Sequence, residues 1–204
     1  MQQGQLYIVS APSGAGKTSL LSQLRQQLKY VTVSVSHTTR PPRSGEIEGE
    51  HYQFVSVEAF KQAIQEELFL EYAQVFDNYY GTSKASIAAL LNTGKDVILE
   101  IDWQGAQQVR KQTQDAISIF ILPPSQAALE ERLRQRQQDS EDTIQRRMRE
   151  ARNEISHYPE YDYVIINDHF ADALADLLAI FRSERLRLPR QRQVHAELLN
   201  ALVN

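Results

Sequence analysis

A stretch near the amino terminus has the residue types and spacing of a phosphate-binding loop. The sequence from Ala11 to Thr18 is APSGAGKT; it follows a short apolar run and opens a segment with helical periodicity. Glycines in such a loop let backbone N–H groups surround phosphate oxygens, and the amino end of the following helix adds a favourable dipole. Lys17 can reach the β- and γ-phosphates of a nucleoside triphosphate, and the Thr18 hydroxyl can bind Mg²⁺. The predicted loop residues are Ala11, Pro12, Ser13, Gly14, Ala15, Gly16, Lys17 and Thr18.

The first position of this loop holds Ala11, where the usual pattern has glycine. Alanine tolerates most backbone angles other than positive φ, so we expect the loop to accept it. The alternative is an ordinary glycine-rich turn between a strand and a helix. The strand–loop–helix context, together with Lys17 and Thr18, favours the phosphate-binding interpretation.

Two carboxylates close a second apolar run, VILEID. Glu100 and Asp102 are two residues apart, so they lie on the same side of a strand. Ligands bind at the carboxyl ends of parallel strands in such sheets. An acidic residue at a strand end is often only a solubilising group, but the upstream phosphate loop favours a metal-binding role here. We expect Glu100 to lie near a Mg²⁺ ion held by Thr18.

The stretch between residues 36 and 54 could bind a second, anionic molecule. Arg40 and Arg43 bracket two prolines that stiffen the backbone and fix the positions of the two guanidinium groups. Tyr52 and Tyr80 add phenolic donors. Arginine and tyrosine donors together suit a phosphate group, although a solvated loop would have a similar composition.

This stretch also carries a family resemblance. It resembles the guanylate kinase signature at every fixed position, with APSGAGKT before it and DWQGA (residues 102–106) after it, and the likeness spans roughly residues 4–185. The resemblance implies a nucleoside monophosphate kinase of the bacterial cytoplasmic type, with a core, a GMP-binding insertion and an arginine-bearing lid. It implies ATP with Mg²⁺ as phosphoryl donor, and GMP, with dGMP as a further acceptor. The matching positions are Thr38, Thr39, Arg40, Arg43, Glu46, Gly49, Tyr52 and Phe54.

Carried over position by position, the resemblance assigns two sets of acceptor-binding residues. The guanine set makes chemical sense, because the pairing edge of guanine offers N–H donors that a carboxylate such as Glu71 accepts in pairs. Adenine presents an acceptor at the same place, and a site of buried acceptors discriminates strongly against it. The set on the GMP phosphate is Arg40, Arg43, Tyr52 and Tyr80, and the set on the guanine is Ser36, Glu71, Thr82 and Asp102.

Seven arginines lie between residues 132 and 152. The resemblance places Arg136 and Arg147 on the triphosphate, where with Lys17 they would offset charge in the transition state. Family members usually have glycine where this chain has Gln137. A charged surface hairpin is the alternative interpretation of this segment.

The elements that must position these residues form an alternating pattern. Short apolar strands are expected at residues 5–10, 97–101, 117–122 and 163–167, and an alternating strand at residues 31–36. Helices are expected near residues 16–29, 84–91, 103–111, 125–137, 140–156, 172–188 and 190–203. This order predicts an α/β fold of the P-loop NTPase type, a parallel sheet with helices on both faces. We expect one domain, with core segments 1–35, 84–124 and 157–204, a GMP-binding insertion at 36–83 and a lid at 125–156.

Composition excludes several classes of protein. The 204 residues include no cysteine, so a disulfide scaffold, a cysteine-ligated metal and a thiol nucleophile are ruled out. The net charge of −4 argues against a nucleic-acid binder. No membrane-spanning run and no secretory signal is present, so a cytoplasmic location is expected.

We therefore expect an ATP:GMP phosphotransferase. A scaffold module that binds protein ligands and a kinase for AMP or dTMP are the alternatives; the intact phosphate loop opposes the first, and Glu71 with the 36–54 motif opposes the second. The oligomeric state stays open, although the arginine-rich segment 182–204 could form a contact between copies.

Overall fold

A five-stranded parallel sheet forms the centre of the molecule. The computed structural model describes residues 3–75, 77–135 and 141–203. Every neighbouring pair in this sheet runs parallel, in the order β2-β7-β1-β8-β9. The predicted α/β fold with a parallel sheet is therefore confirmed. The strands are β1 (Leu6–Ser10), β2 (Val31–Val33), β7 (Asp96–Glu100), β8 (Ile117–Leu122) and β9 (Tyr163–Ile166).

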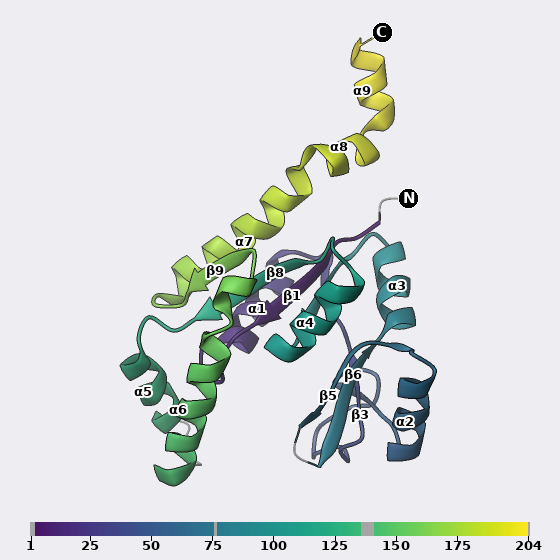
Figure 1. Ribbon diagram of the computed structural model, residues 1–204. Coiled ribbons are helices and arrows are strands. Elements are labelled where there is room, and N and C mark those ends of the chain that lie inside the picture. Colours follow the sequence, from purple (N-terminus) through teal and green to yellow (C-terminus); the bar gives the residue numbers. More distant parts are fainter. Residues whose placement is uncertain (1–2, 76, 136–140, 204) are drawn as a thin grey trace.

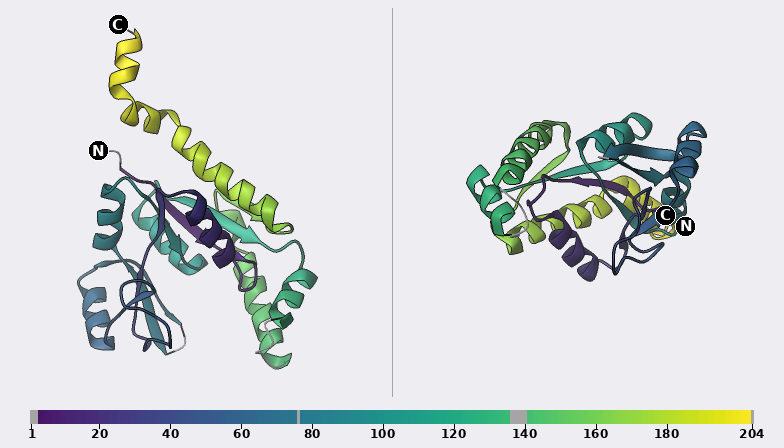
Figure 2. Two further views of the ribbon diagram at one scale, coloured as in Figure 1. Left: turned by 180° about the vertical axis from the view of Figure 1, so that it is seen from behind. Right: turned by 90° about the horizontal axis from the view of Figure 1, so that it is seen from below.

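Helices cover both faces of this sheet, which explains why its central strands are apolar without alternation (Figure 2). On β1, Tyr7 and Val9 face a core shared with α1 and α7, whereas Leu6 and Ile8 face a core shared with α3 and α4. None of the described helices is long and apolar enough to cross a membrane. The covering helices are α1 (Lys17–Gln27), α3 (Lys84–Asn92), α4 (Trp103–Gln112) and α7 (Phe170–Leu186).

A second, smaller sheet lies beside the first, in the order β4-β3-β6-β5 (Figure 1). Phe60 of its helix α2 is buried and stacks on Phe69 of β5. The single strand predicted at residues 31–36 is wrong: the chain forms β2 in the first sheet and β3 in the second. The alternating pattern continues from β2 into β3, so it cannot reveal that the two strands pair with different sheets. The elements are β3 (Ser36–Thr38), β4 (Tyr52–Phe54), α2 (Val57–Gln65), β5 (Phe69–Val75) and β6 (Asn78–Ser83).

Two helices form a hairpin after β8, namely α5 (Gln126–Gln135) and α6 (Glu141–Ile155). The hairpin has a small apolar cluster of its own, separate from the two cores of the sheet. Its members are Leu129, Leu133, Ile144, Met148 and Ala151. A short 3₁₀ turn (Tyr158–Glu160) then leads into β9.

The carboxyl-terminal helices extend away from the sheet (Figure 1). The sequence predicts one helix over residues 190–203, but the structure has two, α8 (Leu188–Val194) and α9 (Ala196–Val203). They meet at His195, whose backbone angles are not helical. The α9 helix exposes Leu198 and Leu202 to solvent.

Asp96 ties the arginine-rich carboxyl-terminal segment to the sheet. Its side chain is fully buried and accepts hydrogen bonds from Arg185 Nε and Arg190 Nη2, each at 2.9 Å. It also accepts one from the Gln5 backbone N–H, at 2.9 Å. The Arg185 guanidinium lies 3.5 Å from the centre of the Tyr30 ring. Two of the arginines that the sequence left unexplained thus have a structural role.

Replacing Asp96 by alanine should therefore lower the free energy of unfolding by about 3 kcal/mol, because two largely buried guanidinium groups lose their partner. Urea unfolding followed by circular dichroism measures the change. The matched control is Asp176→Ala on the exposed face of α7, which should change stability by less than about 0.5 kcal/mol. An equal effect of the two substitutions would contradict the anchoring role of Asp96.

Candidate functional site

The predicted phosphate loop connects the carboxyl end of β1 with the amino end of α1. Gly14 and Gly16 both have φ of 92°, a conformation that side-chain-bearing residues rarely adopt. Among the described residues, the non-glycine position with positive φ is Glu67, so Ala11 has no such need. The alanine in place of the usual first glycine is therefore compatible with this backbone.

Asn167 supports this loop, and the sequence analysis missed it. The side chain is buried, and its Nδ2 donates to the Ala15 carbonyl at 2.7 Å. A Cβ on Gly16 would lie only 2.4 Å from the same Nδ2, so the glycine is required by close packing as well as by φ. The Asn167 carbonyl accepts from Arg132 of α5 at 2.9 Å. The one sequence feature that could have pointed to Asn167 is its position directly after an apolar strand, where ligand-binding residues are often found.

Lys17, Thr18 and Glu100 lie together beside the loop. The Thr18 hydroxyl donates to Glu100 Oε1 at 3.2 Å, and Lys17 Nζ lies 3.7 Å from the same oxygen. Burial lowers the pKa of Lys17, and Glu100 opposes that shift by stabilising the ammonium form. A hydroxyl and one carboxylate suit Mg²⁺, which takes few protein ligands and completes its shell with water and phosphate oxygens. No group of three or more His, Cys, Asp or Glu in the described residues could hold a metal by itself.

A buried carboxylate joins the second sheet to α4. Glu71 of β5 is buried, and its Oε1 accepts a hydrogen bond from the Thr82 hydroxyl of β6 at 2.5 Å. A Cβ on Gly105 would lie 3.0 Å from Glu71 Oε2, so glycine leaves room for this carboxylate at the first turn of α4. Asp102 caps the same turn by accepting from the Gly105 backbone N–H at 2.9 Å. Burial, and to a lesser degree the Asp102 charge, raise the pKa of Glu71 to about 7.

Of the predicted phosphate ligands of the acceptor, Tyr52 lies on β4 and Tyr80 on β6, whereas Arg40 and Arg43 lie in the stretch between β3 and β4. Register pairs Ser36 with Tyr52 between β3 and β4, and the Tyr52 and Tyr80 rings meet edge to face with centres 6.0 Å apart. The Arg40 guanidinium lies 5.4 Å from the centre of the Tyr52 ring. Arg40, Tyr52 and Tyr80 are thus in contact, whereas the Arg43 side chain is exposed.

Glu46 forms a two-pronged ion pair with the Arg40 guanidinium in this structure. Its two oxygens accept from Arg40 Nη1 at 3.0 Å and Nη2 at 2.8 Å, and one of them also accepts from the Arg43 backbone N–H at 2.7 Å. The hydrogen bonds from Arg40 and the Arg43 backbone lower the pKa of Glu46 to about 2. A two-pronged contact of this kind is also how arginine binds phosphate. The sequence analysis used Glu46 only as a signature position and missed this contact.

The arginines of the α5–α6 hairpin are only partly described. Arg147 is half-buried on α6, whereas Arg136 and Gln137 lie outside the described residues. Arg134 binds Glu130 at 2.7 Å and Glu141 at 2.5 Å, and so joins the two helices. Arg134 therefore helps to hold the hairpin together.

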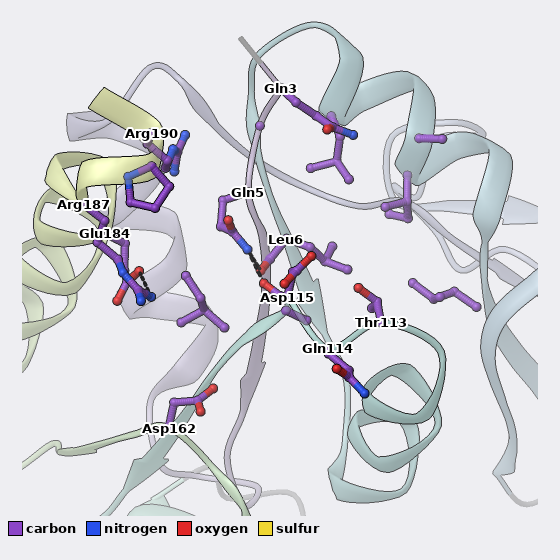
Figure 3. Close-up of a pocket in the computed structure, with 18 of the residues that line it drawn as sticks. Gln3, Gln5, Leu6, Thr113, Gln114, Asp115, Asp162, Glu184, Arg187 and Arg190 are labelled. Carbon is purple, nitrogen blue, oxygen red and sulfur yellow. Dashed lines mark hydrogen bonds and ion pairs between the residues drawn. The ribbon is translucent and has the colours of Figure 1, made fainter. Parts of the chain in front are cut away.

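A cavity of about 970 Å³ lies elsewhere in the described part of the chain (Figure 3). It is formed at the amino ends of β1 and β8 and beside the α7–α8 junction, the opposite end of the sheet from the phosphate loop. Gln5, Asp115 and Arg190 line it, and Gln5 Nε2 donates to the Asp115 carbonyl there. None of the predicted site residues lines this cavity.

Comparison with known proteins identifies the family. The guanylate kinase family model matches residues 3–184. Guanylate kinases of Escherichia coli and Salmonella typhi are each 58% identical over 205 residues, which cover all of this chain and 99% of each relative. The crystal structure of guanylate kinase from Anaplasma phagocytophilum is similar, with a TM-score of 0.73 and 32% identity, over 95% of this chain and 94% of that chain. The glycine loop and the buried carboxylate thus lie within a chain that belongs to the guanylate kinase family.

Proposed function

We infer that this protein transfers the γ-phosphoryl group of ATP to GMP, giving ADP and GDP. The observation that carries this inference is the pairing of two features in one chain of this family. One is a phosphate loop in which Lys17, Thr18 and Glu100 converge. The other is the buried Glu71–Thr82 pair on the second sheet. The first suits a triphosphate donor, and the second suits a base that presents N–H groups.

On the donor side, the proposed roles of the residues follow from the negative charge of the triphosphate. Lys17 would hold the β- and γ-phosphates, while the backbone N–H groups of residues 13–18 would surround their oxygens. Thr18, with Glu100 nearby, would hold Mg²⁺; when bound, the ion neutralises charge that develops on the phosphates. Arg147, and Arg136 outside the described residues, would bring further positive charge from the hairpin acting as a lid.

At the acceptor side, Arg40, Arg43, Tyr52 and Tyr80 would hold the GMP phosphate. Glu46 accepts from Arg40 Nη1 and Nη2, so the Nε–H and the second Nη2–H of the same guanidinium would be the donors offered to the phosphate. The acceptor phosphate is already largely ionised at neutral pH, so the transfer needs positioning and charge neutralisation rather than a general base. Closure of the segments 36–83 and 125–156 over the core would exclude water from the reacting phosphates.

The guanine is proposed to lie against Ser36, Glu71, Thr82 and Asp102. The Glu71 carboxylate can accept both the N1–H and the N2–H of guanine, while the Thr82 hydroxyl holds the carboxylate in place. Gly105 leaves the space that this carboxylate needs next to α4. Adenine would face the same carboxylate with an acceptor, so we expect strong selection for GMP and for dGMP, which has the same base.

A coupled assay that detects ADP tests the function directly. Mg·ATP is supplied with GMP, dGMP, AMP, CMP, UMP or dTMP, one at a time. We expect turnover with GMP and dGMP, at rates at least about 100-fold above those with the other acceptors. Equal turnover with AMP or dTMP would show that the chain is a different monophosphate kinase, and turnover with none would favour a binding module.

The affinity for GMP should depend on pH through Glu71. Because its pKa is raised to about 7, the carboxylate is mostly ionised at pH 8 and mostly protonated at pH 6. Only the ionised form accepts both guanine donors, so the KM for GMP should rise by up to about tenfold between pH 8 and pH 6. The Glu71→Gln variant is the control. It should show only the smaller change caused by titration of the GMP phosphate, and an equal rise in both proteins would contradict the assignment.

Two further proposals concern the cellular location of the protein and its oligomeric state. We propose a cytoplasmic location, because ATP and GMP are the substrates. We also propose that α9, which exposes Leu198, Leu199 and Leu202, forms a contact between copies of the chain. Sedimentation velocity of the full chain and of a Leu198→Glu/Leu202→Glu variant measures whether such a contact exists.

A further inference from the structure

The strand β5 lies at one edge of the second sheet, and α4 of the core packs against it. The strand order β4-β3-β6-β5 leaves one side of β5 to be covered by something other than a strand of this sheet. Leu70 of β5 shares an apolar core with Ala106 and Val109 of α4 and with the central sheet. The helix therefore joins the sheet that carries the proposed acceptor site to the sheet that carries the phosphate loop.

Two glutamines of α4 take the place of a neighbouring strand along β5. The Tyr72 backbone N–H donates to Gln108 Oε1 at 3.0 Å, and Gln108 Nε2 donates to the Tyr72 carbonyl at 2.8 Å. One turn further along, Gln112 Nε2 donates to the Leu70 carbonyl at 2.6 Å. A side-chain amide offers both a donor and an acceptor, so Gln108 satisfies both backbone groups of one strand residue. We call these three hydrogen bonds the glutamine clamp.

The glutamine clamp holds the backbone on both sides of Glu71. Leu70 and Tyr72 are the direct neighbours of Glu71 in the chain, and each has a backbone group bound to α4. Glu71 itself lies opposite Thr82 of β6 in the register of the sheet, and its side chain accepts from the Thr82 hydroxyl. The position of this carboxylate is therefore fixed by β6 on one side and by α4 on the other.

The face of α4 that carries the glutamine clamp also carries residues close to Glu71. Asp102, Gly105, Gln108 and Gln112 follow one another at intervals of three or four residues, so they lie along one face of the helix. Asp102 caps the helix through the Gly105 N–H, and a Cβ on Gly105 would lie 3.0 Å from Glu71 Oε2. The two carboxylates proposed for guanine thus come from different parts of the chain, and the glutamine clamp sets their relative position.

We propose that Gln108, together with Gln112, is a positioning residue for the guanine base, because the glutamine clamp holds Glu71 at the distance from Asp102 at which both can meet one base. This inference rests on the proposed function, since it takes guanine as the ligand of Glu71. It also agrees with closure of the segment 36–83. The sheet would turn about its β5 edge and carry Tyr52, on β4 at the opposite edge, toward the phosphate loop.

Steady-state kinetics of Gln108→Ala test this role. The KM for GMP should rise about tenfold, because a small displacement of a positioned group weakens its interaction strongly, whereas the KM for Mg·ATP should change by less than about twofold. The matched control is Gln107→Ala, which removes the adjacent glutamine of α4 and a 3.0 Å hydrogen bond to Glu160. A role limited to covering an edge strand predicts equal KM values for GMP in the two variants, and that result would overturn the proposal.

A double-mutant cycle shows whether Gln108 acts through Glu71. In the unsubstituted background, Gln108→Ala should lower the ratio of kcat/KM for GMP to that for AMP at least about threefold, because the carboxylate that selects the base is displaced. In the Glu71→Gln background, the same substitution should change this ratio by less than about twofold. Effects that multiply independently would overturn the positioning role.

Amide hydrogen exchange of the nucleotide-free protein gives a measurement that needs no substrate. The Tyr72 N–H should exchange at least about tenfold faster in Gln108→Ala than in the unsubstituted protein, and at an unchanged rate in Gln107→Ala. Unchanged exchange in Gln108→Ala would overturn the proposal and, alongside normal GMP turnover, would leave the proposed function standing. Absence of GMP turnover in the unsubstituted protein would refute the proposed function, and with it the role of Gln108 toward guanine.

Discussion

Replacing Lys17 by alanine should lower kcat for GMP phosphorylation by about 100- to 1,000-fold, the usual loss when one positioned charge is removed from a transition state. The ammonium lies on the phosphate loop, 3.7 Å from Glu100. Its positive charge would balance negative charge on the β- and γ-phosphates as the bond between them breaks. No other lysine lies in the loop, so no neighbouring residue can supply the same contact.

Steady-state kinetics with Mg·ATP and GMP measure this loss, and Lys29→Ala is the matched control. Lys29 is exposed just beyond the end of α1, so its removal should leave kcat within about twofold of the unsubstituted value. Circular dichroism and thermal unfolding show whether the Lys17→Ala protein keeps its fold when Glu100 retains only its hydrogen bond from Thr18. A folded Lys17→Ala protein with nearly normal kcat would remove the phosphate-loop argument.

Replacing Glu71 by glutamine should lower kcat/KM for GMP by about 100-fold or more, mostly through KM. The amide keeps the size of the side chain, so the space beside Gly105 stays filled. It offers one acceptor and an N–H₂ donor in place of two acceptors, so one guanine N–H is left without a partner. A buried polar group that loses its partner weakens recognition strongly.

The selectivity between bases is the sharper readout of this variant. The ratio of kcat/KM for GMP to that for AMP should fall at least tenfold, because adenine no longer meets a carboxylate. Glu66→Gln, which changes an exposed carboxylate of the same segment, should leave the ratio unchanged. An unchanged ratio for Glu71→Gln would refute the guanine assignment.

The features that were predictable from the sequence are those that neighbouring residues encode. The phosphate loop is contiguous, and its strand and helix flank it directly. The strand β8 is short and almost wholly apolar and is followed directly by Pro123 and Pro124, so its position as a buried strand was foreseeable. The helix start at Lys84 follows a serine that caps it through the Ser86 backbone N–H.

The features that the sequence did not reveal depend on how separate segments of the chain pack against one another. Asn167 reaches the carbonyl of Ala15 across 152 positions of the chain, and no local pattern reveals that contact. Glu46 matched the family signature, but its two-pronged bond to Arg40 depends on how the intervening loop folds back. The switch from β2 to β3 was invisible because both strands share one alternating pattern.

The hydrogen bonds of Asp96 also imply an order in which contacts form while the chain is being synthesised. Its three partners lie far apart in the sequence: Gln5 precedes Asp96 by 91 positions, whereas Arg185 and Arg190 follow it by 89 and 94. A nascent chain that has emerged only as far as β9 has all five strands of the central sheet but lacks both cations that pair with this buried carboxylate. The anchor therefore closes only after residue 190 has been synthesised, well after the last strand of the central sheet.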